Sequence, residues 1–382
     1  MLNNLTGFEP KEQTYTSAAA VNANRPNATD YTPPQESLTA ERLQGAKRSY
    51  ATRRIDLGDA ACLLTGGVRP QAGDLVLARI DRLGHHRRIE SPEGRRGQLY
   101  PGDEVLLCYG ARYASDQFEA LVPKHLEPCH MVAAGGIAAH CVQRHSSTKP
   151  ATQITPIGLV ADAAGQPLNL KRYAQPFSGP RAVRPYSMAV VGTSMNAGKT
   201  TTVAGMVRGL SSSGFKVAVG KVTGTGAGGD RWAYVDAGAA LVLDFTDFGH
   251  ASTYQAPAAE LAGLLRGMVH TLSAARPDVI ILELADGLFF SETEDLVADK
   301  LFAELVDDVL IAAGDAMGAE AGVRRLAEHG IAPLALAGKM TSSPLAVREA
   351  TRVLDAPVVE LDDLMEGTWL PPRLVAPARI SA

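Results

Sequence analysis

The feature that most restricts the fold is a glycine-containing loop between an apolar strand and a helix. Residues 190–201 read VVGTSMNAGKTT, and an apolar strand is expected at 188–191. Gly192 and Gly198 let the backbone turn tightly and aim successive N–H groups inward. The helix that begins near Lys199 adds the positive end of its dipole. Strand, loop and helix in this order predict a phosphate-binding site; the alternative is an ordinary turn that contains this triplet by chance.

The spacing of the loop departs from the common phosphate-binding pattern. That pattern is G-x-x-x-x-G-K-[ST], whereas five residues separate Gly192 from Gly198 here. In such a loop Lys199 reaches the terminal phosphates, and the Thr200 hydroxyl ligates Mg²⁺. The residues expected to surround the nucleotide come from the loop and the first helical turn: Gly192, Thr193, Asn196, Ala197, Gly198, Lys199, Thr200 and Thr201.

The second half of the chain alternates short apolar runs with amphipathic stretches. This texture is typical of a parallel sheet that helices cover on both faces. The expected strands are 188–192, 216–222, 239–245, 278–284, 307–313, 332–338 and 356–361. The expected helices are 198–213, 231–238, 256–275, 295–306, 318–330 and 344–355. We therefore predict a doubly wound α/β domain over residues 186–382, with its ligands at the carboxyl ends of the strands.

The first half of the chain has a different texture. Residues 1–48 are predicted to be a disordered lead followed by a short helix, with Ser37 as its N-cap. Residues 49–178 form a small β-rich, barrel-like domain, because short alternating runs are broken by Gly, Asp and Pro. Two stretches in it, 72–80 and 101–109, repeat a Gly-Asp turn followed by a Val/Leu strand. Residues 126–146 have a more helical pattern.

Composition excludes several classes of protein. Of the 382 residues, 46% are hydrophobic and 20% charged, which is ordinary for a globular protein of two or three domains. The net charge of −4 favours neither nucleic acid nor an acidic membrane as partner. No signal peptide and no long uncharged apolar run is evident. Four scattered cysteines do not make a disulfide framework, so a cytoplasmic location is expected.

The loop GTSMNAGKTT resembles the G-T-x-x-x-x-G-K-T loop of dethiobiotin synthetase and its relatives, which belong to the SIMIBI class of P-loop NTPases. In that family five residues between the glycines are normal. Residues 216–230 resemble the strand and substrate loop of the family, and Lys221 falls at a lysine that reaches toward substrate and phosphate. Residues 277–290 resemble a strand followed by E-G-x-G, which implies that Glu283 holds Mg²⁺. ELADG departs from this pattern by placing leucine at the first glycine.

Other polar residues also follow predicted strands and therefore face the same crevice. Asp230, Asp244 and Asp286 are further candidate metal ligands, and Asp247 lies close to Asp244 in the sequence. The loop after 245 also offers the polar side chains of His250, Ser252, Thr253 and Tyr254. After the strand at 332–338, a base-contacting role is expected for Gly338, Lys339 and Thr341. No guanine-reading motif is evident there, which favours ATP over GTP. Each of these residues could instead serve as a turn or cap residue.

A second group of chemically active residues lies in the β-rich half, at Cys129, His130, His140, Cys141 and His145. If residues 135–145 are helical, Cys141 and His145 share a face, a spacing that suits a metal. The intervals match no common zinc pattern, so buried cysteines and packed histidines are the alternative.

The function expected from these features is a Mg²⁺-ATP-dependent kinase or ligase that phosphorylates a small molecule, and the resemblance to the family implies a carboxylate as the acceptor. In it Lys199, Lys221 and Glu283 are the catalytic residues, and Thr200 and Glu283 hold the metal. The alternative is a nucleotide-driven switch or assembly ATPase or GTPase that acts on a protein partner; a nucleotide-binding adaptor is a third possibility. The expected partners are a small-molecule substrate and a second copy of the chain, without nucleic acid or membrane.

Overall fold

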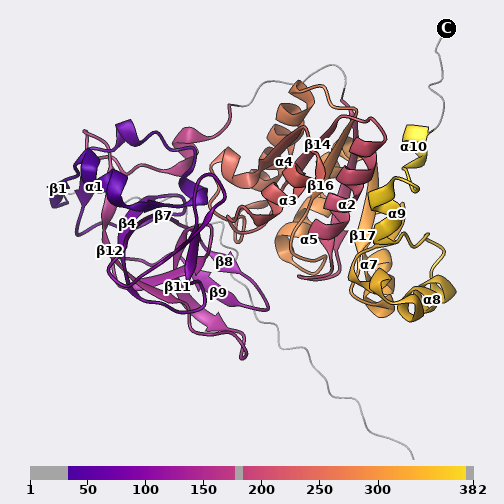
Figure 1. The fold of residues 1–382 in the computed structure, drawn as a ribbon, viewed down its shortest axis with the longest axis horizontal. Coiled ribbons are helices and arrows are strands. Elements are labelled where there is room, and N and C mark those ends of the chain that lie inside the picture. The colour runs from indigo at the N-terminus through magenta and orange to yellow at the C-terminus, as the bar shows by residue number, and fades with distance from the viewer. Residues whose placement is uncertain (1–32, 177–183, 376–382) are drawn as a thin grey trace, which may run out of the picture. The chain divides into compact units, whose positions relative to one another are not determined.

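The computed structural model describes residues 33–176 and 184–375. In Figure 1 the ribbon runs from indigo at the first described residues to yellow at the last. Residues 33–176, the β region, contain a ten-stranded and a two-stranded sheet, and residues 184–375, the α/β region, contain a six-stranded sheet. Residues 1–32 of the disordered lead and short helix predicted for residues 1–48 lie outside the described part of the chain.

The α/β region is built on a fully parallel sheet. Its strands are β13 (Tyr186–Gly192), β14 (Val217–Lys221), β15 (Leu241–Asp244), β16 (Val279–Glu283), β17 (Asp308–Ala312) and β18 (Ala335–Ala337). Their order is β15-β14-β16-β13-β17-β18, and every neighbouring pair is parallel. The predicted strand at 356–361 contributes only one parallel bridge, between Val358 and Leu336. The α/β prediction is thus confirmed, with six strands in the sheet.

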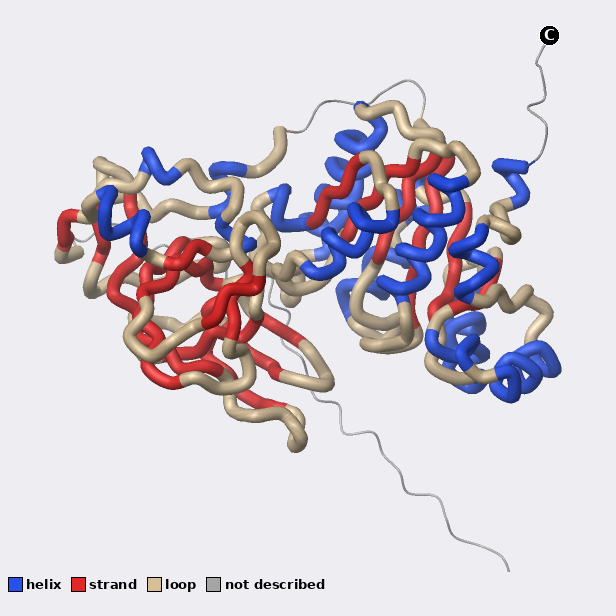
Figure 2. The backbone as a smooth tube through the Cα atoms, viewed as in Figure 1, coloured by secondary structure: helices blue, strands red, loops and turns tan. Residues whose placement is uncertain are grey.

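Helices cover both faces of this sheet, as Figure 2 shows in blue around red strands. The longer helices are α2 (Lys199–Ser212), α3 (Gly229–Ala237), α4 (Ala258–Ala274), α7 (Ala316–Ala327) and α8 (Pro344–Val353), and the shorter ones are α5 (Ser291–Ala298), α6 (Lys300–Leu305), α9 (Leu361–Glu366) and α10 (Pro372–Val375). Met188 and Val190 pack with residues of α2 and α3, whereas Ala189 and Val191 pack with α4 to α7. Since side chains alternate along a strand, this near-continuous apolar run supplies two cores.

The β region contains a closed ring of strands. Its strands are β1 (Gln35–Ser37), β2 (Lys47–Arg48), β3 (Cys62–Leu64), β4 (Leu75–Arg82), β5 (Arg88–Glu90), β6 (Arg96–Gln98), β7 (Glu104–Tyr109), β8 (Arg112–Tyr113), β9 (Phe118–Leu121), β10 (Cys129–Ala133), β11 (Ile137–Arg144) and β12 (Thr152–Ala161). Strand β12 pairs with β4, β4 with β7, β7 with β11, β11 with β10, and β10 with β12 again. The barrel-like architecture is therefore confirmed, and the two echoing stretches pair with each other as β4 and β7.

Two local predictions in the β region are wrong. Residues 126–146 form the antiparallel strands β10 and β11 instead of a helix, because each strand also pairs with a further strand of the ring. The short helix α1 spans Ala40–Gly45, and its N-cap is Thr39, whose hydroxyl accepts from the Arg42 N–H at 3.2 Å. The predicted cap Ser37 instead ends β1.

The end of β18 lies against the phosphate-binding loop. Gly338 has φ +95°, and a Cβ at this position would lie 2.8 Å from the Ala313 nitrogen and even closer to the Ala197 carbonyl oxygen. The next residue, Lys339, donates its backbone N–H to that same carbonyl at 2.8 Å. Only glycine tolerates this conformation and this approach at once.

The Gly338→Ala substitution is therefore expected to destabilise the protein by about 1–3 kcal/mol, because it forces a left-handed backbone and a clash onto an alanine. Urea denaturation followed by circular dichroism measures the change. The matched control is Gly314→Ala, where a Cβ meets nothing within 4 Å and φ is not positive, so stability should be nearly unchanged. Equal stability of the two variants would contradict the tight packing at Gly338.

Candidate functional site

The predicted phosphate-binding loop connects β13 to α2, as expected. Gly198, with φ +102°, is the N-cap of α2, and a Cβ added to Gly192 would lie 2.7 Å from the Lys199 Nζ. The left-handed conformation of Gly198 therefore favours glycine, whereas a Cβ at Gly192 would displace the Lys199 side chain. The Lys199 side chain folds back over the loop, where Nζ donates to the Ser194 carbonyl oxygen at 3.0 Å and to the Asp286 carbonyl oxygen. Burial lowers the pKa of Lys199, although Glu283 and Asp286 act against this effect.

The next residue, Thr200, lies between two carboxylates. Its Oγ1 is 3.1 Å from Asp230 Oδ1 and 3.2 Å from Glu283 Oε1. A hydroxyl has one proton, so it donates to one of these carboxylates at a time. Glu283 is 1% exposed at the end of β16, and its other oxygen accepts from the Tyr234 hydroxyl on α3. The structure thus brings together Thr200, Glu283 and Asp230, which were all predicted as candidate metal ligands.

Lys221 completes the cluster from the neighbouring strand. β14 and β16 are parallel neighbours with Lys221 in register with Glu283, so both side chains leave the sheet at the same edge. The Lys221 ammonium forms an ion pair with Asp230. Burial opposes the charged form of Lys221, but Asp230 and Glu283 together hold its pKa above the ordinary value. For Asp230, burial is outweighed by Lys221, so the pKa of this carboxyl is below its usual range.

Glu283 and Asp286 have raised pKa values. Burial raises the pKa of Glu283 to about 7, although Lys221 and Lys199 act in the opposite direction. Burial also raises the pKa of Asp286, which lies in the loop after β16, and Lys199 acts against this shift. A buried carboxyl beside two ammonium groups can hold or release a proton near neutral pH, which is a property of functional sites.

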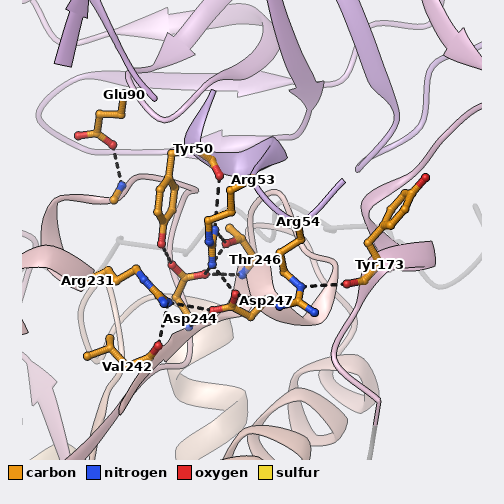
Figure 3. A network of polar contacts seen from close by, with 11 residues as sticks. Tyr50, Arg53, Arg54, Glu90, Tyr173, Arg231, Val242, Asp244, Thr246 and Asp247 are labelled. Carbon is orange, nitrogen blue, oxygen red and sulfur yellow. Dashed lines mark hydrogen bonds and ion pairs between the residues drawn. The ribbon is translucent and has the colours of Figure 1, made fainter. Parts of the chain in front are cut away.

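Asp244 does not join this cluster. Its carboxylate accepts from the Tyr50 hydroxyl and from Arg53 of the β region, and it also caps the 3₁₀ turn η5 (Phe245–Phe248) through the Thr246 N–H. Asp247 belongs to the same network, which Figure 3 shows. The candidate metal role of Asp244 is therefore corrected: its oxygens face groups that hold the two regions together.

The other predicted polar residues mostly serve the local backbone. Thr253 accepts from the Gly224 N–H at 2.8 Å, Ser252 accepts from the Tyr254 N–H at 3.2 Å, and Tyr254 donates to Glu119 at 3.2 Å. His250 borders a cavity of about 370 Å³ together with Lys171 and Glu260. The Thr341 hydroxyl donates to the Gly338 carbonyl oxygen at 2.9 Å. The predicted contacts of Gly338, Lys339 and Thr341 with a base remain predictions.

The phosphate-binding loop also contacts the β region through Asn196. Asn196 has φ +62°, and its amide donates to the Asp116 carboxylate at 2.9 Å from the turn between β8 and β9. Sequence reasoning missed Asp116, and it also missed Tyr234. Of the other loop residues, Thr193 donates its N–H to the Ala312 carbonyl oxygen at 3.0 Å, Ala197 is buried, and Thr201 is exposed.

The cysteine–histidine group is not arranged as a metal site. In the described ranges 33–176 and 184–375, no three His, Cys, Asp or Glu side chains are placed to hold a metal ion. His130 and His140 lie on paired strands with ring centroids 5.8 Å apart, and the His130 Nδ1 accepts from the Cys141 N–H at 3.2 Å. Packed histidines and free cysteines, the alternative reading, fit this arrangement.

No protein-family model and no curated protein matches the chain. Among solved structures, it is similar to the signal recognition particle receptor FtsY from Elizabethkingia anophelis, with 20% identity over 50% of this chain and 63% of that chain and a TM-score of 0.34. It is also similar to chloroplast FtsY from Physcomitrella patens, with 19% identity, 51% and 66% coverage and a TM-score of 0.34. A third is the signal recognition particle 54 kDa protein from Aeropyrum pernix K1 in complex with GDP, with 19% identity, 52% and 47% coverage and a TM-score of 0.35.

These similarities concern the fold alone, over about half of this chain and less than two thirds of each of these three proteins. Membership of the SIMIBI class and of its dethiobiotin synthetase-like subgroup therefore remains a prediction from the sequence. The FtsY from E. anophelis has also been solved with GDP. The preference of this chain for ATP remains a prediction.

The prediction of a small-molecule kinase or ligase is not upheld: the solved structures to which the chain is similar are two FtsY receptors and one signal recognition particle protein. The predicted small-molecule partner is likewise not upheld, and the expected homodimer is not shown. No helix in the described part of the chain is long and apolar enough to cross a membrane.

Proposed function

We propose that the chain is a Mg²⁺-dependent nucleoside triphosphatase whose nucleotide state acts as a switch toward a protein partner, in the cytoplasm, where its free cysteines stay reduced. The observation that carries this proposal is the Thr200 cluster. There, the hydroxyl that follows the loop lysine lies within 3.2 Å of both Asp230 and Glu283. Nucleotide-bound Mg²⁺ takes a hydroxyl, one or two carboxylates, phosphate oxygens and waters as ligands, so this donor set fits the ion.

The charges around the cluster suit phosphoanhydride hydrolysis. Water adds to the γ-phosphorus while the bond to the β-phosphate oxygen breaks, which yields a nucleoside diphosphate and inorganic phosphate. Lys199 and Lys221 approach from the loop and from β14, so they offset negative charge on the transferring group from two sides. Asp286, whose carboxyl has a raised pKa, is suited to orient the attacking water.

A switch is favoured because the groups that face the phosphates belong to segments with contacts outside the site. Asp286 is followed by Phe289, which is 76% exposed. Met317, 81% exposed, precedes Gly318, where an added Cβ would lie 3.5 Å from Thr193 Oγ1. Large exposed apolar side chains beside a phosphate loop suit a protein partner that docks according to the nucleotide state.

The Lys199→Ala substitution should lower the hydrolysis rate by roughly 10²–10³-fold, since it removes a positive charge from the transition state. Inorganic phosphate release is measured with Mg²⁺-ATP and Mg²⁺-GTP in parallel. The control is Lys216→Ala, because Lys216 is exposed at the opposite end of the strand that carries Lys221. Undiminished turnover in Lys199→Ala would place the site elsewhere.

The affinity for Mg²⁺ should weaken as pH falls below about 7, approaching a tenfold loss per pH unit, because protonated Glu283 is not a ligand. Titration calorimetry with a non-hydrolysable nucleotide measures this dependence, and Glu283→Gln should remove it. In the metal-free protein the sign for stability follows from the raised pKa. The contribution of the Glu283 carboxyl to the free energy of unfolding is present below its unfolded pKa of 4.5 and is lost as pH rises through about 7. A pH-independent Mg²⁺ affinity would contradict the assignment of Glu283.

A photo-crosslinking residue at position 289 should form covalent adducts with a partner protein. The set of adducts should depend on which nucleotide is bound. The reason is that Phe289 follows the loop carrying Asp286. Adducts formed with a non-hydrolysable triphosphate and with a diphosphate are compared by mass spectrometry. The matched control is position 353 on α8, where Val353 is 52% exposed. Identical adducts in both nucleotide states, or equal adducts at both positions, would contradict a switch surface at Phe289.

A further inference from the structure

The first turn of α3 is held by the β region from one side. Gly228, the N-cap of α3, donates its backbone N–H to Glu90 Oε2 at 2.6 Å. Glu90 is 2% exposed at the end of β5, and its other oxygen forms an ion pair with Arg96 at 2.9 Å. A carboxylate at a helix N-terminus is stabilised by the helix dipole and by the unpaired N–H groups there. The β region therefore fixes the start of the helix on which Asp230 lies.

The β region also holds the same turn through a buried chain of ion pairs, which Figure 3 shows. Arg53 Nη2 lies 2.6 Å from Asp247 Oδ1, and Asp247 Oδ2 lies 3.2 Å from Arg231 Nη1. The Arg53 side chain is 11% exposed and that of Asp247 is 4% exposed. Removing one partner of a buried pair leaves the other charge uncompensated. Arg231 directly follows Asp230, so this chain holds the residue next to the one that contacts Thr200 and Lys221.

Close packing between these two contacts restricts the movement of the first turn of α3. A Cβ on Gly228 would lie 2.9 Å from the Tyr50 ring, and a Cβ on Gly135 would overlap the Gly226 carbonyl oxygen. The Tyr50 hydroxyl in turn donates to Asp244 at the end of β15. Backbones and rings that are packed this closely cannot shift by small steps. The first turn of α3 therefore keeps its position only while the β region is packed against it.

We propose that Arg53 and Glu90 are positioning residues of the nucleotide site: they hold α3 so that Asp230 faces Thr200 and Lys221. This inference rests on the proposed nucleotide function and assigns control of Mg²⁺ affinity to the β region. Neither residue contacts the Thr200 cluster directly, and both act through Asp230. Because linkage is reciprocal, binding of Mg²⁺-nucleotide strengthens the packing of the β region against α3 by the same factor.

The fluorescence emission of Trp232 reports on the packing of the β region against α3. Its indole packs against Gly94 of the β region and against Gly228, and its buried Nε1 has no hydrogen-bond partner among the described residues. The chain has two tryptophans, so in a Trp369→Phe background the emission comes from Trp232 alone. The emission should shift when Mg²⁺-nucleotide binds to the full chain. That shift should be lost in Arg53→Ala.

A double-mutant cycle tests the proposal. The Mg²⁺ affinity of the full chain, saturated with a non-hydrolysable nucleotide, is measured for Arg53→Ala, Asp230→Asn and the double variant. Arg53→Ala should weaken Mg²⁺ roughly tenfold, whereas in the Asp230→Asn background it should have no further effect. Arg53→Lys should restore part of the affinity because it keeps a positive charge beside Asp247. The control Arg42→Ala removes the ion pair with Glu104 inside the β region and should leave the affinity unchanged.

Additive effects of Arg53→Ala and Asp230→Asn would overturn the proposal, because they would show that Arg53 does not act through Asp230. If Arg53→Ala does not fold, Glu90→Gln replaces it in the same cycle, since it keeps the side-chain volume while it weakens the contact with Gly228 and removes the ion pair with Arg96. Folded Arg53→Ala and Glu90→Gln with unchanged Mg²⁺ affinity would also overturn it. A wild-type chain that binds no Mg²⁺-nucleotide would overturn the proposed function itself, which separates the two failures.

Discussion

The structure depends on keeping opposite charges together at the carboxyl edge of a buried parallel sheet. Lys199 is 6% exposed and Glu283 1% exposed, and such groups are strongly destabilising unless they are compensated. The compensation comes from the register of β14 and β16, which sets Lys221 opposite Glu283, and from Asp230, which pairs with Lys221. The cluster therefore persists only if the sheet, the phosphate-binding loop and α3 keep their relative positions.

The β region supplies part of that constraint. Its barrel presents Arg53 to the chain that ends at Arg231 and Glu90 to the start of α3. It also places Asp116 on Asn196 of the phosphate-binding loop. Two of the segments that surround the phosphate position are thus in contact with the β region, so its role extends beyond covering the α/β region.

This arrangement suits a protein that reports its nucleotide state. Under the proposed function, a change at the γ-phosphate position would act on Asp230 and Asp286. These residues belong to segments that reach the β region and the exposed Phe289 respectively. A metabolite kinase would instead be expected to enclose a substrate next to the loop. The acidic group Asp244, which sequence reasoning assigned to such a site, is engaged by Tyr50 and Arg53.

Sequence alone determined the parallel α/β fold and the glycine-containing loop between β13 and α2, because strand periodicity and glycine spacing are local signals. The resemblance to dethiobiotin synthetases pointed to Lys221 and Glu283, which stand in register at the ends of neighbouring strands. The helical reading of residues 126–146 failed because their small apolar residues suit either structure, and pairing within the barrel made them strands. Only the tertiary structure could place Asp116 on Asn196, 80 residues away, or Glu90 on Gly228, 138 residues away. Such contacts are decided by how two folded regions pack against each other, and no short-range pattern encodes that packing.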